Sequence, residues 1–310
     1  ICKSIIRFSF MKIKYIFIGI VFIISSILTF ESCGNNSGSS KLSADKTIRL
    51  NFDTLTIVER EHLQSDTTKS SCYINLAFVY PIEGEKVDIH KLQNIFITSF
   101  FGVDYDSLSP NDAMNKYVQN FIDNYEKDAN VFHSSLISIE KLESLSSDSV
   151  DEEYTDYFNS YYEFLDDSVT YLDNLILSFQ VKQSISKDGV STFDTFRNRV
   201  IDLKRGVLIT ESEIFKVGYE QTLKGLFVNS LMEQNDVRSI LELEELGFFG
   251  IEEMLPNNNF LLNNLGIIYR FNKGEYSAYQ LDAPEIFIPF ELLKPILKEN
   301  SIIRNITKIN

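Results

Sequence analysis

The sequence predicts an α+β fold, an antiparallel sheet packed by segregated helices and organised as two sequential subdomains. Several segments alternate apolar and polar residues with the period of two that is typical of a half-buried strand. Other segments carry apolar residues at helical spacing instead. Strands and helices follow one another without the regular βαβ alternation of a parallel α/β protein, so the α+β class is favoured.

The first 32 residues are expected to be a secretory leader, not part of the fold. Met11 is followed by two lysines and then by an apolar run, which is the order of regions in a signal peptide. Residues 1–10 precede this start and are interpreted as misannotated. The run of about 16 residues is shorter than the roughly 20 that a membrane-spanning helix needs.

Cys33 follows the apolar run and is the predicted lipidation site. Its surroundings resemble a Bacteroidetes-type lipoprotein signal, although the preceding residues differ from the usual lipobox; a cleaved signal or a simple N-terminal anchor is the alternative. Residues 33–46 have the Gly, Ser and Asn content of a flexible tether. We therefore expect a membrane anchor in the cell envelope, at the outer membrane and facing the periplasm.

The N-terminal subdomain, residues 47–185, is predicted to open with two strands and two helices. Asp88 can cap the first helix and Gly102 can end it. Ser109 and Pro110 suit the cap and first position of the second helix. The elements in order are strands over 47–58 and 72–82, the second ended by Pro81, and helices over 88–102 and 109–129.

Three further antiparallel strands are predicted after an acidic break, with turns at Asp166–Asp167 and Lys187–Gly189. They cover residues 157–167, 169–186 and 190–203. The C-terminal subdomain, residues 186–300, continues with a capping box formed by Thr210 and Glu213. A helix over 219–232 follows, and the chain ends as strand, turn, strand and helix.

The stretch from Tyr276 to Leu293 is predicted to seal the fold. Proline at position 284 favours an extended entry, and the strand after it should bury Ile286 and Ile288 and expose Phe287. Pro289 should end the pairing. The final helix is expected to cover the sheet with Leu292, Leu293, Ile296 and Leu297.

The order of these motifs resembles the RsiV-like and PdaC-like extracytoplasmic domain family over most of residues 70–299. The residues that carry the resemblance are Asp202, Gly206, Glu211, Ile214, Phe215, Asn259, Phe260, Glu275, Tyr279, Ile286, Ile288, Pro289 and Phe290. One departure is clear, because Lys187–Val190 stands where the family usually has a Gly-Gly-Ala-His turn. The resemblance implies a binding domain, since the catalytic domain of PdaC is a separate one, and RsiV is a receptor for lysozyme.

The composition excludes several functions. The net charge of −15 disfavours nucleic acid as a partner and permits a cationic one. The three histidines, His62, His90 and His133, have no metal-ligand spacing, and no nucleophile elbow or phosphate-binding loop is present. We therefore predict a protein without catalytic residues, metal or cofactor.

Two sets of surface residues are candidates for function. An acidic, aromatic segment could contact a cationic partner, although its acids could instead be a solvated face and its aromatics core; the residues are Tyr154, Tyr157, Tyr161, Tyr162, Asp166 and Asp167. Five Asp-Ser/Thr triplets resemble Bacteroidetes O-glycosylation acceptors, although Asp-Ser is also ordinary turn chemistry; the acceptors are Thr54, Thr67, Ser107, Ser149 and Ser168.

The predicted function is that of a cell-envelope lipoprotein with a non-catalytic RsiV-like domain. Its ligand would be a lysozyme-like protein or a peptidoglycan-derived molecule, bound through a groove or a sheet edge. The alternative is a peptidoglycan-modifying enzyme or its accessory, by analogy with PdaC.

Overall fold

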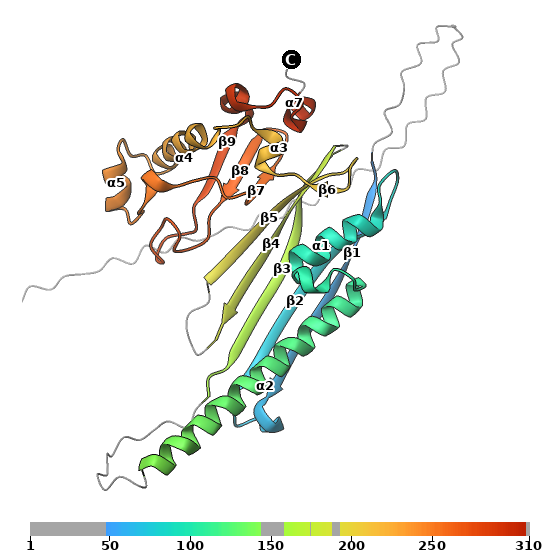
Figure 1. Ribbon diagram of the computed structural model, residues 1–310, viewed down its shortest axis with the longest axis vertical. Helices are drawn as coiled ribbons and strands as arrows, with labels where there is room; N and C mark the ends of the chain where they lie inside the picture. Colours follow the sequence, from blue (N-terminus) through green and yellow to red (C-terminus); the bar gives the residue numbers. More distant parts are fainter. Residues whose placement is uncertain (1–47, 144–157, 174, 188–192, 308–310) are drawn as a thin grey trace, which may run out of the picture. The chain divides into compact units, whose positions relative to one another are not determined.

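The computed structural model describes residues 48–143, 158–173, 175–187 and 193–307 (Figure 1). Within these ranges, six strands form one sheet in the order of the chain. They are β1 (Leu50–His62), β2 (Ser71–Gly84), β3 (Tyr161–Leu172), β4 (Ile176–Ser186), β5 (Phe193–Asp202) and β6 (Val207–Leu208). A second sheet and several helices complete a mixed architecture, so the predicted α+β class is confirmed.

One pairing in the large sheet differs from the prediction. β2 and β3 are parallel, with Cys72 opposite Tyr161 and Ala77 opposite Asp166, whereas the other neighbours are antiparallel. The chain between β2 and β3 includes two helices, and such a crossover can bring it back to the end where β2 began. The local alternation of a strand carries no information about this direction.

The predicted turn at Asp166–Asp167 is wrong, because both residues lie inside β3. The turn between β3 and β4 is instead built by Asp173, whose carboxylate accepts the backbone N–H groups of Leu175 at 2.7 Å and Ile176 at 2.8 Å. This is the side-chain-to-backbone bonding for which Asp is favoured in turns. The second predicted turn falls between β4 and β5, and its residues 188–192 lie outside the described part of the chain.

Pro81 does not end β2, contrary to the prediction, because the strand continues to Gly84. The register with β1 shifts between Asn51 and Phe52, where Pro81 lies opposite Phe52. A proline is tolerated at such an irregularity because it has no N–H to offer the ladder. β3 pairs with β2 only as far as Ala77, so the missing donor faces no third strand.

Two helices lie on one face of the large sheet, α1 (Ile89–Phe100) and α2 (Pro110–Glu143) (Figure 1). The predicted caps are present, since Asp88 accepts the N–H of Lys91 and Ser109 accepts the N–H of Asp112, both at 3.2 Å. Gly102, after α1, has a φ of 107°, in the region that favours glycine. α2 extends beyond its predicted end at residue 129.

Replacing the α2 cap, Ser109→Ala, should lower the free energy of unfolding by about 1 kcal/mol, because the N–H of Asp112 loses its partner. Urea unfolding of the two proteins measures the difference. Ser135→Ala in the same helix is a matched control, since its hydroxyl donates to the carbonyl of Val131, which remains a helix carbonyl without it. Equal losses in both variants would contradict a capping role.

The first hydrophobic core lies between these helices and the sheet. Its centre is a stacked ring pair, Phe96 of α1 and Phe179 of β4, with centroids 4.1 Å apart. Leu76 and Phe78 of β2 are fully buried beside them. Inward-facing residues therefore alternate along β2, as the sequence predicted, whereas the first four residues of β4 are all buried because both faces of that strand are covered.

The second core belongs to the C-terminal part of the chain, which packs on the opposite face of β4 and β5 through Ile176 and Val200. The hydroxyl of Ser178 donates to the carbonyl of Leu262 at 2.6 Å across this junction. A three-stranded antiparallel sheet, β7 (Phe260–Leu262), β8 (Gly266–Arg270) and β9 (Glu285–Pro289), packs with α3 (Glu211–Ile214), α4 (Glu220–Gln234), α5 (Ile240–Glu245), α6 (Phe290–Leu293) and α7 (Ile302–Thr307). Short 3-10 turns cover Leu63–Ser65, Val103–Tyr105, Ile251–Glu253 and Lys294–Ile296.

The closing stretch follows its predicted alternation. Ile286 and Ile288 are buried in the second core, and Phe287 between them is exposed. The helix predicted to follow this strand is shorter than expected, because α6 ends at Leu293 and continues as a 3-10 turn. Leu292 is 53% exposed and does not cover the sheet, unlike Leu293, Ile296 and Leu297.

The predicted subdomain boundary at 185/186 falls at the end of β4, and β4 pairs with β5 in the same sheet. Residues 46–310 form one compact unit.

Cys72 is a buried free thiol, and burial raises its pKa to about 11. The predicted leader, tether and lipidated Cys33 lie outside the described ranges, and within those ranges no helix has the length and apolarity to cross a membrane.

Candidate functional site

The residues predicted as one partner surface are divided between two faces of β3. Tyr161 and Asp167 are buried on the helix-covered face, and the hydroxyl of Tyr161 donates to Asp128 of α2 at 3.0 Å. Tyr162 and Asp166 point to the opposite face and are exposed. Tyr154 and Tyr157 are not among the described residues. The surface is therefore not as predicted, because successive residues of a strand face opposite sides.

Tyr162 instead belongs to a group of side chains on the face of β1–β3 away from α1 and α2, which we call the aromatic patch: the exposed Val58, Tyr162 and Phe164 and the partly buried Tyr73. The strand registers bring them together, because Tyr73 is opposite Tyr162 and Asn75 lies between Val58 and Phe164. The rings of Tyr73 and Phe164 are 5.6 Å apart. Val58 is 59% exposed and Phe164 is 42% exposed.

A cation extends the aromatic patch at its β1 side. The guanidinium of Arg60 lies 4.8 Å above the Tyr73 ring and donates to the hydroxyl of Ser71 at 3.1 Å. Such a stack holds the arginine in place and leaves its outer edge available. Val58, Arg60 and Tyr73 were not identified from the sequence. Val58 and Tyr73 lie in predicted strands, where the alternation could have assigned them to this face, but Arg60 lies beyond the predicted end of its strand at residue 58.

The aromatic patch adjoins the outer edge of the large sheet. β1 is 13 residues long and pairs with β2 on one side, and no described strand pairs with its other side. The N–H of Thr54 is bonded to the carboxylate of Asp53 at 2.8 Å. Beyond that point, Thr56, Val58 and Arg60 are exposed. A long edge of this kind can accept an added strand.

At the opposite side of the sheet, β6 pairs only with the end of β5, and asparagine side chains close the outer edge of β5 before it. The Oδ1 of Asn259 accepts the N–H of Asn198 at 2.6 Å, and its Nδ2 donates to the carbonyl of Phe196 at 3.0 Å. The Oδ1 of Asn272 accepts the N–H of Phe196 at 2.9 Å. These amides satisfy the outward-facing backbone groups of β5 as a neighbouring strand would. The two edges of the sheet therefore differ, and β1 is the open one.

The helix-covered face holds two buried carboxyl groups. Glu163 accepts hydrogen bonds from Tyr117 of α2 at 2.5 Å and from Gln183 of β4 at 2.7 Å, and burial raises its pKa despite them. Asp167 accepts the N–H of Val79 at 2.7 Å, and burial raises its pKa to about 8. Both lie between the sheet and the helices, so they connect elements and are not placed to meet a partner.

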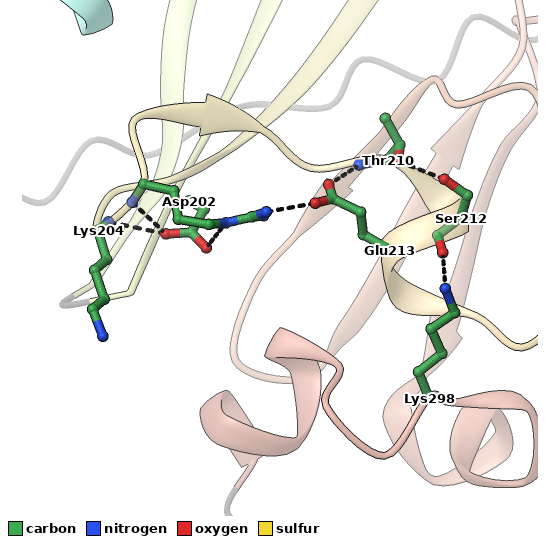
Figure 2. Close-up of polar contacts among 7 residues, drawn as sticks. Asp202, Lys204, Thr210, Ser212, Glu213 and Lys298 are labelled. Atoms are coloured by element: carbon green, nitrogen blue, oxygen red, sulfur yellow. Dashed lines mark hydrogen bonds and ion pairs between the residues drawn. The ribbon is translucent and has the colours of Figure 1, made fainter.

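The motif from Asp202 to Glu213 forms a polar chain at the end of β5 (Figure 2). The Oδ1 of Asp202 accepts the N–H groups of Lys204 and Arg205, both at 3.0 Å, and its Oδ2 pairs with the Arg205 Nε at 2.7 Å. Arg205 continues to Glu213 at 2.6 Å, and this hydrogen bond lowers the pKa of Glu213. The second Glu213 oxygen accepts the N–H of Thr210 at 3.1 Å, which supports the predicted capping box.

A further acid of this motif, Glu211, is buried. Its carboxylate accepts the N–H of Asn258 at 2.7 Å and the hydroxyl of Tyr219 at 2.8 Å. Asn258 in turn accepts the N–H of Glu211 at 3.0 Å, so α3 and the start of β7 hold each other. Gly206 has a φ of 63°, as the tight turn after β5 requires. The motif thus joins the two sheets and is structural.

The predicted glycosylation acceptors occupy two kinds of position. Thr67 and Ser107 lie in exposed turns, as predicted. Thr54 and Ser168 are exposed but lie within β1 and β3, where the backbone is already part of a sheet. Ser149 lies outside the described residues. Glycosylation stays a prediction for all five.

Among the residues that the structure describes, no group of three or more His, Cys, Asp and Glu could hold a metal ion.

The chain resembles known proteins in two ways: its C-terminal region matches a protein family, and most of its fold matches solved structures. Residues 212–291 match the family described as "Protein of unknown function (DUF3298)". The crystal structure of a DUF3298 member from Bacteroides fragilis is 25% identical to this chain, with a TM-score of 0.71, and the match covers 84% of this chain and 98% of that one. A DUF3298 family protein from Pseudomonas aeruginosa is 10% identical, with a TM-score of 0.54 and coverage of 81% and 96%, and shows the fold alone.

A search of curated proteins gave no match. The resemblance to the RsiV-like and PdaC-like family stays a prediction. The chain therefore carries a DUF3298 match at residues 212–291, within a fold that it shares with solved proteins of the DUF3298 family.

Proposed function

We propose that this chain is a lipid-anchored protein of the cell envelope that binds a protein partner without catalysis. The binding surface is the aromatic patch together with the open edge of β1. The observation that carries the proposal is that exposed apolar side chains adjoin the unpaired edge of a sheet whose other edge is closed. Contiguous exposed apolar side chains often mark interaction surfaces, whereas single exposed apolar residues are ordinary.

The net charge of the whole chain favours a basic partner, whereas the aromatic patch itself carries one cation, Arg60. Asp166 is exposed on the same face as the aromatic patch, Glu59 and Glu61 are exposed on the other face of the same β1 edge, and the whole chain carries a net charge of −15. Opposite charges steer association and fix orientation, whereas the apolar centre supplies most of the affinity. A lysozyme-like protein, which the RsiV-like resemblance implies, is basic and suits this surface.

Binding can be tested with residues 46–310, which form one compact unit. The immobilised fragment should retain lysozyme at low salt and lose it as salt rises, since exposed charges are screened. Phe164→Ser and Tyr162→Ser should each weaken retention about tenfold or more, because both remove exposed aromatic area from the aromatic patch.

Leu292→Ser is the matched control, since Leu292 is also an exposed apolar residue, at 53%, but lies in α6, away from the aromatic patch. It should leave retention unchanged. Retention of muropeptides but not of lysozyme would make the ligand a glycan, and release of product from peptidoglycan would replace binding by catalysis. If Phe164→Ser and Leu292→Ser weaken retention equally, the aromatic patch is not the binding surface.

A further inference from the structure

Apolar side chains are exposed in and after α5, in the C-terminal region. Leu241 of α5 is 65% exposed, and Leu246 and Phe249 in the turn that follows are 47% and 45% exposed. Single exposed apolar residues are ordinary, but several of them together often mark an interaction surface. α5 lies beside α4 at the outer end of the C-terminal region (Figure 1). This part of the protein is therefore a candidate interaction surface that the aromatic patch does not include.

The turn after α5 is held by a neighbouring loop. The N–H of Phe249 donates to the carbonyl of Tyr276 at 3.1 Å. Gly247 has a φ of 105°, and a Cβ at this glycine would lie 3.4 Å from Cδ1 of Leu281. Leu281 therefore packs on the same turn that carries Leu246 and Phe249. We call these residues the α5 surface: Leu241, Leu246, Phe249 and Leu281.

Exposed glutamates lie next to the α5 surface. They belong to α5 and to the 3-10 turn that follows it: Glu244, Glu245, Glu252 and Glu253. Leu241 and Glu245 stand at positions i and i+4 of α5, so they are neighbours on one face of the helix. No described residue forms an ion pair with any of these glutamates. The sequence has no Lys, Arg or His between Arg238 and Arg270, so this stretch supplies no cation to offset them.

The charges decide which partner fits the α5 surface. A second copy of this chain would bring the same glutamates to the contact, and an anionic membrane would bring phosphates, so both would be repelled. The acidic segment 144–157, which has no Lys or Arg, would be repelled as well. A protein segment that carries basic residues beside apolar ones can pair with the glutamates and cover the apolar side chains at the same time.

We propose that the α5 surface binds a protein segment in which basic residues flank apolar ones. The apolar residues pack against Leu246, Phe249 and Leu281, and the lysine or arginine side chains pair with the neighbouring glutamates. In such a contact the apolar centre supplies most of the affinity, and the charges at the rim set orientation and rate. This site goes beyond the proposed function, because it is separate from the aromatic patch and from the β1 edge.

Three synthetic peptides of equal length test this chemistry. The first combines lysine and leucine in an amphipathic pattern, the second has serine in place of leucine, and the third has glutamate in place of lysine. Each peptide is titrated into residues 46–310 by calorimetry. We expect the Lys/Leu peptide to bind about tenfold or more tightly than the Lys/Ser peptide, because only the first covers the apolar side chains. The Glu/Leu peptide should not bind, because its charges are repelled.

Phe249→Ser should weaken binding of the Lys/Leu peptide about tenfold, because it removes exposed aromatic area from the α5 surface. Glu244→Gln together with Glu245→Gln should weaken binding at low salt and change little at high salt, since exposed charges are screened. All three positions are exposed, so the unfolding temperature should stay that of the parent. NMR shifts in the parent should fall at residues 241–249, which locates the peptide without any variant.

Two matched controls lie elsewhere in the chain. Phe164→Ser removes an exposed ring from the aromatic patch, and Glu59→Gln with Glu61→Gln removes two exposed acids from β1. Both should bind the Lys/Leu peptide as the parent does. Equal affinities for the Lys/Leu and Lys/Ser peptides would overturn the proposal, and so would NMR shifts confined to β1–β3. A parent that binds this peptide at α5 but does not retain lysozyme would contradict the proposed function and leave this site in place.

Discussion

Asp167→Asn should make the protein more stable than the parent, and the gain should be larger at pH 8 than at pH 5. Asp167 is buried, its Oδ1 accepts the N–H of Val79, and its Oδ2 has no partner among the described residues. Burial raises its pKa from the ordinary value of 3.8 to about 8. The folded protein therefore keeps a proton on Asp167 that the unfolded chain releases above pH 4.

The sign of the pH dependence follows from this proton. Between about pH 4 and pH 8 the folded state binds one proton more than the unfolded state, so this group makes stability fall as pH rises. Its contribution changes by about 4 kcal/mol between pH 5 and pH 8. The Asn variant keeps the acceptor for Val79 and cannot ionise, so it lacks this loss.

Urea unfolding at pH 5, 6.5 and 8 measures the effect. The difference between Asp167→Asn and the parent should grow with pH, whereas Ser168→Asn, which adds an amide on the exposed face, should follow the parent. A difference that stays constant over this range would show that Asp167 is ionised inside the fold.

Asn259→Ala should lower the free energy of unfolding by about 3 kcal/mol. The amide of Asn259 bonds the N–H of Asn198, the carbonyl of Phe196 and the carbonyl of Arg270. Alanine leaves two backbone groups at the β5 edge without this partner, whereas the carbonyl of Arg270 in β8 keeps the amide of Asn257. Each unsatisfied buried group costs about 1–3 kcal/mol. Urea unfolding at fixed pH gives the loss.

The neighbouring Asn257 supplies the control. Its exposed amide bonds the carbonyl of Arg270 at 3.0 Å and accepts the N–H of Asn259 at 3.0 Å, without touching β5. Asn257→Ala should therefore cost about 1 kcal/mol and leave hydrogen exchange at the Asn198 amide slow. If both variants lose the same stability and the Asn198 amide stays protected in each, the hydrogen bonds of the Asn259 amide do not hold the β5 edge.

The sequence predicted elements whose cause is local. Asp88, Ser109 and the capping box at Thr210 are recognisable because a cap needs a particular side chain at a particular place. The alternation of Ile286, Phe287 and Ile288 was also legible, since one face of that strand is buried.

Other features depend on the tertiary fold and could not be read in this way. Asp166 and Asp167 look like a turn, but β3 continues through them, and Asp167 is buried on the helix-covered face, where it bonds to Val79 of β2. Asn259 looks like a loop residue in the sequence. Its amide bonds the outer backbone groups of β5 only because the tertiary fold brings β5 beside it. The aromatic patch likewise depends on the parallel pairing of β2 and β3, which follows from a crossover that no local pattern records.

Hydrogen exchange of residues 46–310 with and without lysozyme tests the central claim, that the protein binds through the aromatic patch and the open β1 edge. Binding should slow exchange of the amides from Thr56 to Arg60, because an added partner covers or pairs with that edge. Unchanged exchange along β1 in a saturated complex, or protection confined to α1 and α2 on the other face, would contradict it.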